Sequence, residues 1–215
     1  MDADGVWDSL TQEQCEGVQA IAMDMWPAFE NSAGEALPNA KIVHDKFHIS
    51  KHLNEAVDKV RKAEHRKLVA EGDDTLKDSK YEWLRNHPDM RKAESANFRE
   101  LHKINLKTSR AWQLKETFSG FWDYSYVGAA EKFFEQWYDK AIRSQLEPIK
   151  AVARMLKNHL PELLNYLSHR ITNAMSEGFN SLIQNIKANA RGLPNFANFR
   201  IRILFHCGKL DMMPA

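Results

Sequence analysis

Two widely separated carboxylates in this chain have the chemistry of a metal site. Asp24 directly follows the apolar run Ala-Ile-Ala-Met, and Glu177 lies far downstream in the string Ser-Glu-Gly-Phe-Asn. Between them, Asp45 and His48 belong to the string His-Asp-Lys-Phe-His. Carboxylate oxygens are the ligands that Mg²⁺ prefers in proteins. Asp24 and Glu177 are therefore candidates to hold one divalent cation together, if the fold brings them to the same place.

Each of these residues also has a purely structural explanation. Asp24 could cap a following helix, because Asp is a favoured N-cap residue. Glu177 falls in the first turn of an expected helix, where the helix dipole stabilises a negative charge. Asp45 and His48 could fix a strand-to-helix junction by hydrogen bonding, or contact a phosphate. The residue types alone leave both sets of roles open.

A dense group of titratable residues, His44, Asp45, His48 and His52, suggests a transition-metal site as a further alternative. Histidines spaced by four on a helix share a face and can bind zinc. His44 need not belong to the same helix, however, because Asp45 falls at the expected junction. No cysteine is nearby and no His-Glu-x-x-His string occurs, so zinc is the less favoured interpretation here.

Predicted strands and predicted helices must position these residues. Short apolar runs at 18–23 and 40–44 predict strands, and Pro27 favours a helix over 27–37 between them. This unit is expected to be parallel with a right-handed crossover. Residues 7–17 have the pattern of the end of a helix. Apolar residues at three- and four-residue steps after Asp45 predict a helix of about 22 residues. The remaining expected helices cover 79–86, 89–106, 108–122, 127–143, 145–168, 174–189 and 196–207, with a break at 192–194.

Composition limits the class of protein. The 215 residues are 43% apolar and carry a net charge of +1, so a sizeable core is expected. The two cysteines have no paired spacing, the start is acidic and without an apolar leader, and no apolar run reaches the ~18–20 residues that span a bilayer. We therefore expect a cytoplasmic protein without membrane segments.

Positive charge gathers towards the C-terminus. Residues 141–215 hold ten Lys and Arg against four Asp and Glu, which suits a polyanionic partner. Four basic residues beyond Glu177 are candidates for phosphate contacts. A solvated helix face whose long side chains cover apolar surface is the alternative. The four are Lys187, Arg191, Arg200 and Arg202.

The order of these strings resembles that of bacterial insertion-sequence transposases of the DDE class, of the ISL-three type. The resemblance extends over nearly the whole chain, and each motif is weak alone but their succession is specific. The matching strings are Ala22-Met23-Asp24-Met25-Trp26, Leu37-Pro38-Asn39-Ala40-Lys41-Ile42-Val43-His44-Asp45-Lys46-Phe47-His48, Thr172-Asn173-Ala174-Met175-Ser176-Glu177-Gly178-Phe179-Asn180-Ser181-Leu182-Ile183 and Asn195-Phe196-Ala197-Asn198-Phe199-Arg200-Ile201-Arg202.

The resemblance implies an α/β, predominantly helical fold. Residues 1–48 would form part of an RNase H-like core, 49–168 a large all-α insertion, and 169–215 the returning helices of the core. It implies phosphodiester hydrolysis and strand transfer at insertion-sequence ends with two divalent ions, Mg²⁺ or Mn²⁺. Asp24 and Glu177 take the positions of the second and third acids, with Asp45, His48 and Asn180 as supporting residues.

Three acids are needed in this family, and the first should lie on a strand before Asp24. Only 23 residues precede Asp24, so the expectation is an N-terminally truncated chain with little activity by itself. The partners implied are the element ends and target DNA, and self-association is left open. The alternative is a non-catalytic DNA- or protein-binding helical module that regulates a full-length transposase.

Overall fold

The computed structural model of the chain describes residues 7–85, 106–190 and 195–208. Their contacts divide the chain into two units, Met1–Ile171 and Thr172–Ala215, and each is considered by itself. Most of the helix expected at 89–106 and the whole break expected at 192–194 lie outside the described residues.

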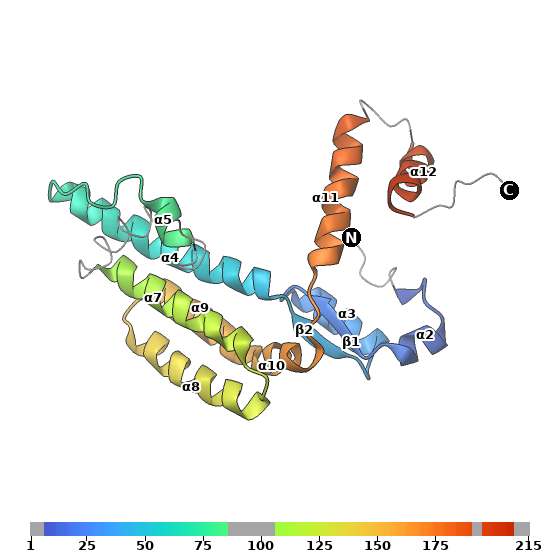
Figure 1. Cartoon of the computed structure of the whole chain (residues 1–215), viewed down its shortest axis with the longest axis horizontal. Coiled ribbons are helices and arrows are strands. Elements are labelled where there is room, and N and C mark those ends of the chain that lie inside the picture. The colour runs from blue at the N-terminus through green and yellow to red at the C-terminus, as the bar shows by residue number, and fades with distance from the viewer. Residues whose placement is uncertain (1–6, 86–105, 191–194, 209–215) are drawn as a thin grey trace. The chain divides into compact units, whose positions relative to one another are not determined.

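The N-terminal part of the first unit contains a strand–helix–strand motif (Figure 1). Strand β1 covers Ala20–Met23, helix α3 covers Pro27–Ala36 and strand β2 covers Lys41–His44. Pro27 stands in the first turn of α3, where its missing N–H costs nothing. The strands are parallel, with Met23 opposite His44. The predicted strands, the helix between them and the parallel pairing are confirmed, and both strands are slightly shorter than expected.

The helix expected over 7–17 is shorter in the structure. Helix α2 covers Gln12–Gly17 and begins where Thr11 forms a capping box with Gln14. The cap sets the start of the helix, so Trp7 and Leu10 lie before it. Trp7 is nevertheless anchored, because its Nε1 donates a hydrogen bond to Ser32 Oγ of α3 at 2.7 Å.

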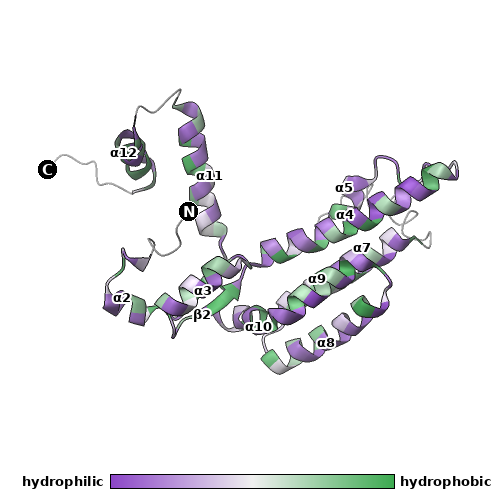
Figure 2. Cartoon of the chain, turned by 180° about the vertical axis from the view of Figure 1, so that it is seen from behind, coloured by the Kyte–Doolittle hydropathy of each residue, from purple (hydrophilic) through white to green (hydrophobic). Residues whose placement is uncertain are grey.

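A helical block makes up the rest of the first unit. The long helix α4 packs against α5, α7 and α9, and α8 packs against α7, α9 and α10. Figure 2 shows apolar and polar residues alternating around α4, as expected of an amphipathic helix with one face in the core. The elements are α4 Lys46–Ala70, α5 Lys80–Leu84, α7 Lys107–Ser119, the 3-10 helix η2 Gly120–Asp123, α8 Val127–Arg143, α9 Glu147–Asn158 and α10 Leu160–His169.

The single helix expected over 145–168 is wrong, because the structure contains two helices there. Helix α9 ends at Asn158, and α10 begins at Leu160. Pro161 explains the break: it has no N–H to donate, and its ring would collide with the carbonyl of Lys157 in a continuous helix. His159 occupies the junction, and α10 turns away to pack against β2.

Aromatic side chains fill the centre of the helical block. Phe118, Phe121, Phe134 and Trp137 are each at most 1% exposed. The ring centroids of Phe118 and Trp137 are 4.7 Å apart in an edge-on arrangement, which is favourable for aromatic pairs. Trp137 Nε1 donates to the Leu114 carbonyl at 2.8 Å, so this indole buries its polar atom without losing a hydrogen bond.

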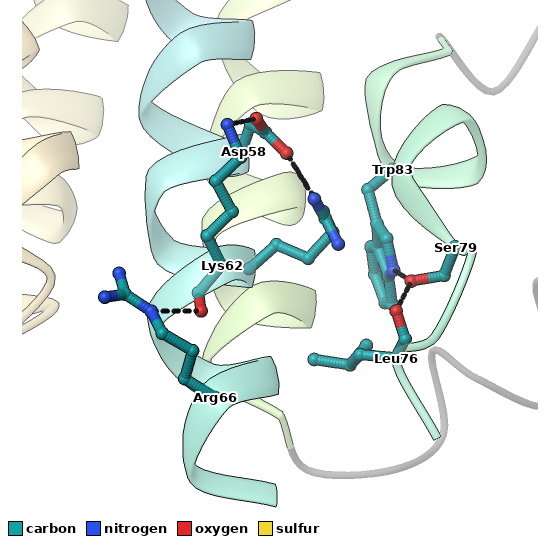
Figure 3. Close-up of polar contacts among 7 residues, drawn as sticks. Asp58, Lys62, Arg66, Leu76, Ser79 and Trp83 are labelled. Carbon is teal, nitrogen blue, oxygen red and sulfur yellow. Dashed lines mark hydrogen bonds and ion pairs between the residues drawn. The ribbon is translucent and has the colours of Figure 1, made fainter. Parts of the chain in front are cut away.

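Helix α5 is held by the buried indole of Trp83 (Figure 3). Trp83 Nε1 donates to Ser79 Oγ at 3.2 Å, and Ser79 Oγ donates to the Leu76 carbonyl at 2.7 Å.

On α4, Asp58 accepts from Arg61 and Lys62, each at 2.8 Å. Burial would raise the pKa of Asp58, but the hydrogen bonds from Lys62 and Arg61 outweigh it and lower that pKa.

The outer edge of β2 is closed by a helix. Asn165 of α10 donates from Nδ2 to the Ile42 carbonyl at 2.8 Å. The neighbouring residue, Lys41, donates its N–H towards the β1 side, so the Ile42 carbonyl faces the other way. The amide thus satisfies a backbone acceptor that would otherwise remain on an open sheet edge.

The second unit consists of helices α11, Ala174–Asn189, and α12, Phe196–Cys207. Both agree with the ranges expected from the sequence. Helix α12 begins at a side-chain cap, because Asn195 Oδ1 accepts from the Asn198 N–H at 2.9 Å. None of the described helices of the chain is long and apolar enough to cross a bilayer.

Candidate active site at the ends of the parallel strands

The two parallel strands bring two acids to one edge of the sheet. Asp24 directly follows β1 and Asp45 directly follows β2. Because Met23 pairs with His44, the two acids follow directly after paired residues at the ends of their strands. The Asp45 N–H also donates to the Met23 carbonyl at 3.3 Å. Functional groups of parallel α/β sheets gather at this carboxyl edge.

Asp24 is paired with a histidine from the first turn of α4. The distance from Asp24 Oδ1 to His48 Nδ1 is 2.9 Å, and the side chains are 48% and 27% exposed. The N-cap of α3 is Trp26, so Asp24 does not occupy the cap position that was its structural alternative. A carboxylate that is half exposed and oriented by an imidazole is suited to binding a cation at the protein surface.

Asp45 is buried and caps α4. Its Oδ1 accepts a hydrogen bond from the Phe47 N–H at 2.7 Å, and its side chain is inaccessible to solvent. This bond satisfies one of the N–H groups that lack a partner in the first turn of the helix. The expected junction role of Asp45 is therefore present in the structure.

Replacing Asp45 by alanine is expected to lower the free energy of unfolding by about 1–2 kcal/mol, because the first turn of α4 loses its acceptor. Urea unfolding followed by circular dichroism measures the loss. Asp45→Asn is the matched control, since asparagine caps helices as well as aspartate does. A loss in Asp45→Asn as large as that in Asp45→Ala would mean that the charge, and not the cap, is what matters.

The side chain of His44 lies beside His159 and Glu30. It is fully buried, and its Nε2 lies 3.3 Å from His159 Nδ1 and 3.6 Å from Glu30 Oε1. Burial, together with His159, lowers the pKa of His44 to about 4, so the imidazole is neutral near pH 7. The alternative in which His44, His48 and His52 share one helix face is wrong, because His44 belongs to β2.

The neighbours of His44 are residues that sequence patterns did not select. Glu30 lies in the first turn of α3, and His159 lies 115 positions from His44. The one local signal was Pro161, which breaks the helix beside His159. Nothing in the spacing of Glu30 or His159 marked them as partners of a strand residue.

The remaining candidate residues belong to the second unit. Glu177 and Asn180 are exposed in the first half of α11. Lys187 is exposed further along α11, and Arg200 and Arg202 are exposed on α12, whereas Arg191 lies outside the described residues. Whether Glu177 meets Asp24 stays a prediction.

Comparison with known proteins assigns the chain to a class. A family model described as a transposase, of the DDE class and ISL3 type, matches residues 2–203. The chain therefore belongs to the ISL3-type family of DDE transposases, which confirms the resemblance drawn from its motifs.

One curated relative makes the comparison more specific. The chain is 26% identical over 200 residues to the transposase for insertion sequence element IS1001 of Bordetella parapertussis. The match covers 92% of this chain and 49% of the relative, so the chain spans about half the length of that protein. No solved structure matches the chain significantly.

Proposed function

We propose that this chain acts in DNA transposition, by contributing Asp24 and Glu177 to a divalent-metal site for phosphodiester hydrolysis and strand transfer at insertion-sequence ends. Family membership supports the general role. The observation that carries the site is the half-exposed carboxylate of Asp24 at the carboxyl edge of the parallel strands.

The donor chemistry fits Mg²⁺ or Mn²⁺. Both ions favour carboxylate oxygens, and Asp24 and Glu177 are accessible carboxylates. When bound, such ions activate the attacking oxygen and stabilise the leaving oxygen. In this proposal His48 positions Asp24 through their 2.9 Å contact. Asn180 lies three residues after Glu177 on the same side of α11, where it can support that carboxylate.

The fold assignment that accompanies this function is also a proposal. Residues 1–48 and 169–215 would form parts of one RNase H-like core, and 49–168 would be a helical insertion within it. The parallel β1–α3–β2 unit and the helical run that follows are consistent with this division. The first of the three family acids is not assigned to a residue of this chain.

DNA is the proposed partner, held through its phosphates. Lys187, Arg200 and Arg202 are exposed on helices that follow Glu177 in the chain, and Arg191 belongs to the same basic stretch. Lys and Arg at such positions bind phosphates through charge-assisted hydrogen bonds and fix the register of the duplex.

A double-mutant cycle for Mn²⁺ binding tests the shared site. Asp24→Asn and Glu177→Gln are each expected to weaken Mn²⁺ binding by at least about tenfold, since each removes a ligand charge. If both ligate one ion, the double variant loses little more than either single variant. Electron paramagnetic resonance of free Mn²⁺ measures the bound fraction.

Asp139→Asn is the control for that cycle, because Asp139 is an exposed acid on α8 that takes no part in the proposed site. It should bind Mn²⁺ like the unmodified chain. Independent, additive losses in the two site variants would show two separate sites, and unchanged binding in either would remove that residue from the proposal.

A further inference from the structure

Three ligand atoms from different elements of the first unit lie within 4.8 Å of one another. They are Glu30 Oε1 of α3, His44 Nε2 at the end of β2, and His159 Nδ1 at the junction of α9 and α10. His44 Nε2 lies 3.6 Å from Glu30 Oε1 and 3.3 Å from His159 Nδ1, and the remaining pair is 3.9 Å apart.

The size of this triangle is that of a metal site. A point equidistant from the three atoms lies about 2.1 Å from each, which falls within zinc–nitrogen and zinc–oxygen bond lengths of roughly 2.0–2.2 Å. Neighbouring corners of a tetrahedron with such bonds are about 3.4 Å apart. Small side-chain movements would therefore complete the geometry.

The electrostatics of the trio favour a cation. Glu30 Oε1 is buried and has no hydrogen-bond partner among the described residues. His44 Nε2 and His159 Nδ1 face each other. When both rings are neutral, one of these nitrogens can donate a single hydrogen bond and the other can accept it. A buried acceptor without a donor costs free energy, and an ion bound to all three atoms would satisfy each of them.

We propose that Glu30, His44 and His159 bind one zinc ion. Two imidazoles and one carboxylate suit zinc better than Mg²⁺, so this site is distinct in chemistry from that of Asp24. The Glu30 and His159 side chains are 20% and 25% exposed, which gives the ion a path of entry and leaves a fourth position for water.

The proposed ion would cross-link three secondary-structure elements. Helix α3 and strand β2 belong to the βαβ unit, and His159 belongs to the helical block. A zinc ion bound only by the folded chain stabilises it by the free energy of binding. The zinc site would thus fix the strands, and the acids at their ends, to the block that supports them.

Cobalt spectroscopy on the metal-stripped chain tests this site. One equivalent of Co²⁺ should bind with the intense visible bands of a four-coordinate ion, and Zn²⁺ should displace it and raise the Tm. Glu30→Gln and His159→Ala should each weaken binding by at least about a hundredfold and abolish the Tm increase. Circular dichroism of the metal-free variants verifies that they fold. If His159→Ala does not fold, the isosteric variant Glu30→Gln still tests whether the trio binds the ion.

Two variants separate this site from its neighbours. The double variant His48→Gln/His52→Gln removes the other histidine pair, and Asp24→Asn removes the proposed catalytic acid; both should keep the cobalt spectrum unchanged. Loss of the spectrum in either, a weak octahedral spectrum, or no binding by the unmodified chain would overturn the proposal. The last result would identify the trio as a hydrogen-bonded cluster only.

Discussion

In an active transposase that contains this chain, Asp24→Asn is expected to lower the frequency of transposition by on the order of a thousandfold or more. The substitution keeps the size of the side chain and removes its charge, so the contact with His48 at the sheet edge can persist while cation binding is lost. Counting transposition events between replicons in living bacteria measures the effect.

Comparison among variants makes that result specific. Glu177→Gln should be as inactive as Asp24→Asn, and the double variant should be no worse, because ligands of one centre act as a unit. Asp139→Asn, with its exposed acid on α8, should transpose normally. Transposition by Asp24→Asn within tenfold of the unmodified element would rule out Asp24 as an essential acid.

Trp137→Ala is expected to produce the largest loss of stability, about 3–5 kcal/mol, as for other large-to-small substitutions of buried aromatic residues. The side chain is 1% exposed, lies between Phe118 and Phe134, and donates to the Leu114 carbonyl. Its removal leaves a cavity at the meeting of α7 and α8 and an acceptor without its donor. Equilibrium unfolding in urea gives the value.

Two further variants separate the contribution of Trp137 packing to stability from that of its indole hydrogen bond and from the effect of removing an exposed aromatic residue. Trp137→Phe should lose less, because it retains most of the apolar contact and gives up the indole hydrogen bond. Tyr126→Ala is the exposed aromatic control: Tyr126 is 80% exposed, so its loss should stay within about 0.5 kcal/mol. If Trp137→Ala resembled Tyr126→Ala, the helical block would not depend on the packing of this aromatic centre.

Local signals in the sequence were sufficient for most elements. The helices at 127–143, 174–189 and 196–207 were predicted with the bounds that the structure has, because helical periodicity and capping residues act within one or two turns. The expected helix at 145–168 was too long because apolar periodicity continues through Pro161, although its missing N–H ends the hydrogen-bond ladder. At 7–17, the helix begins only at Gln12, because the side chain of Thr11 caps it there.

The sequence by itself determined the family, the parallel strands, and the placing of Asp24 and Asp45 directly after them, since each follows from short-range patterns or from the order of motifs. Tertiary structure alone decided that His44 turns to Glu30 and His159, that Asp24 is held by His48, and that Asn165 closes the edge of β2. Such contacts depend on how helices pack, and packing joins residues according to shape and volume rather than their separation along the chain.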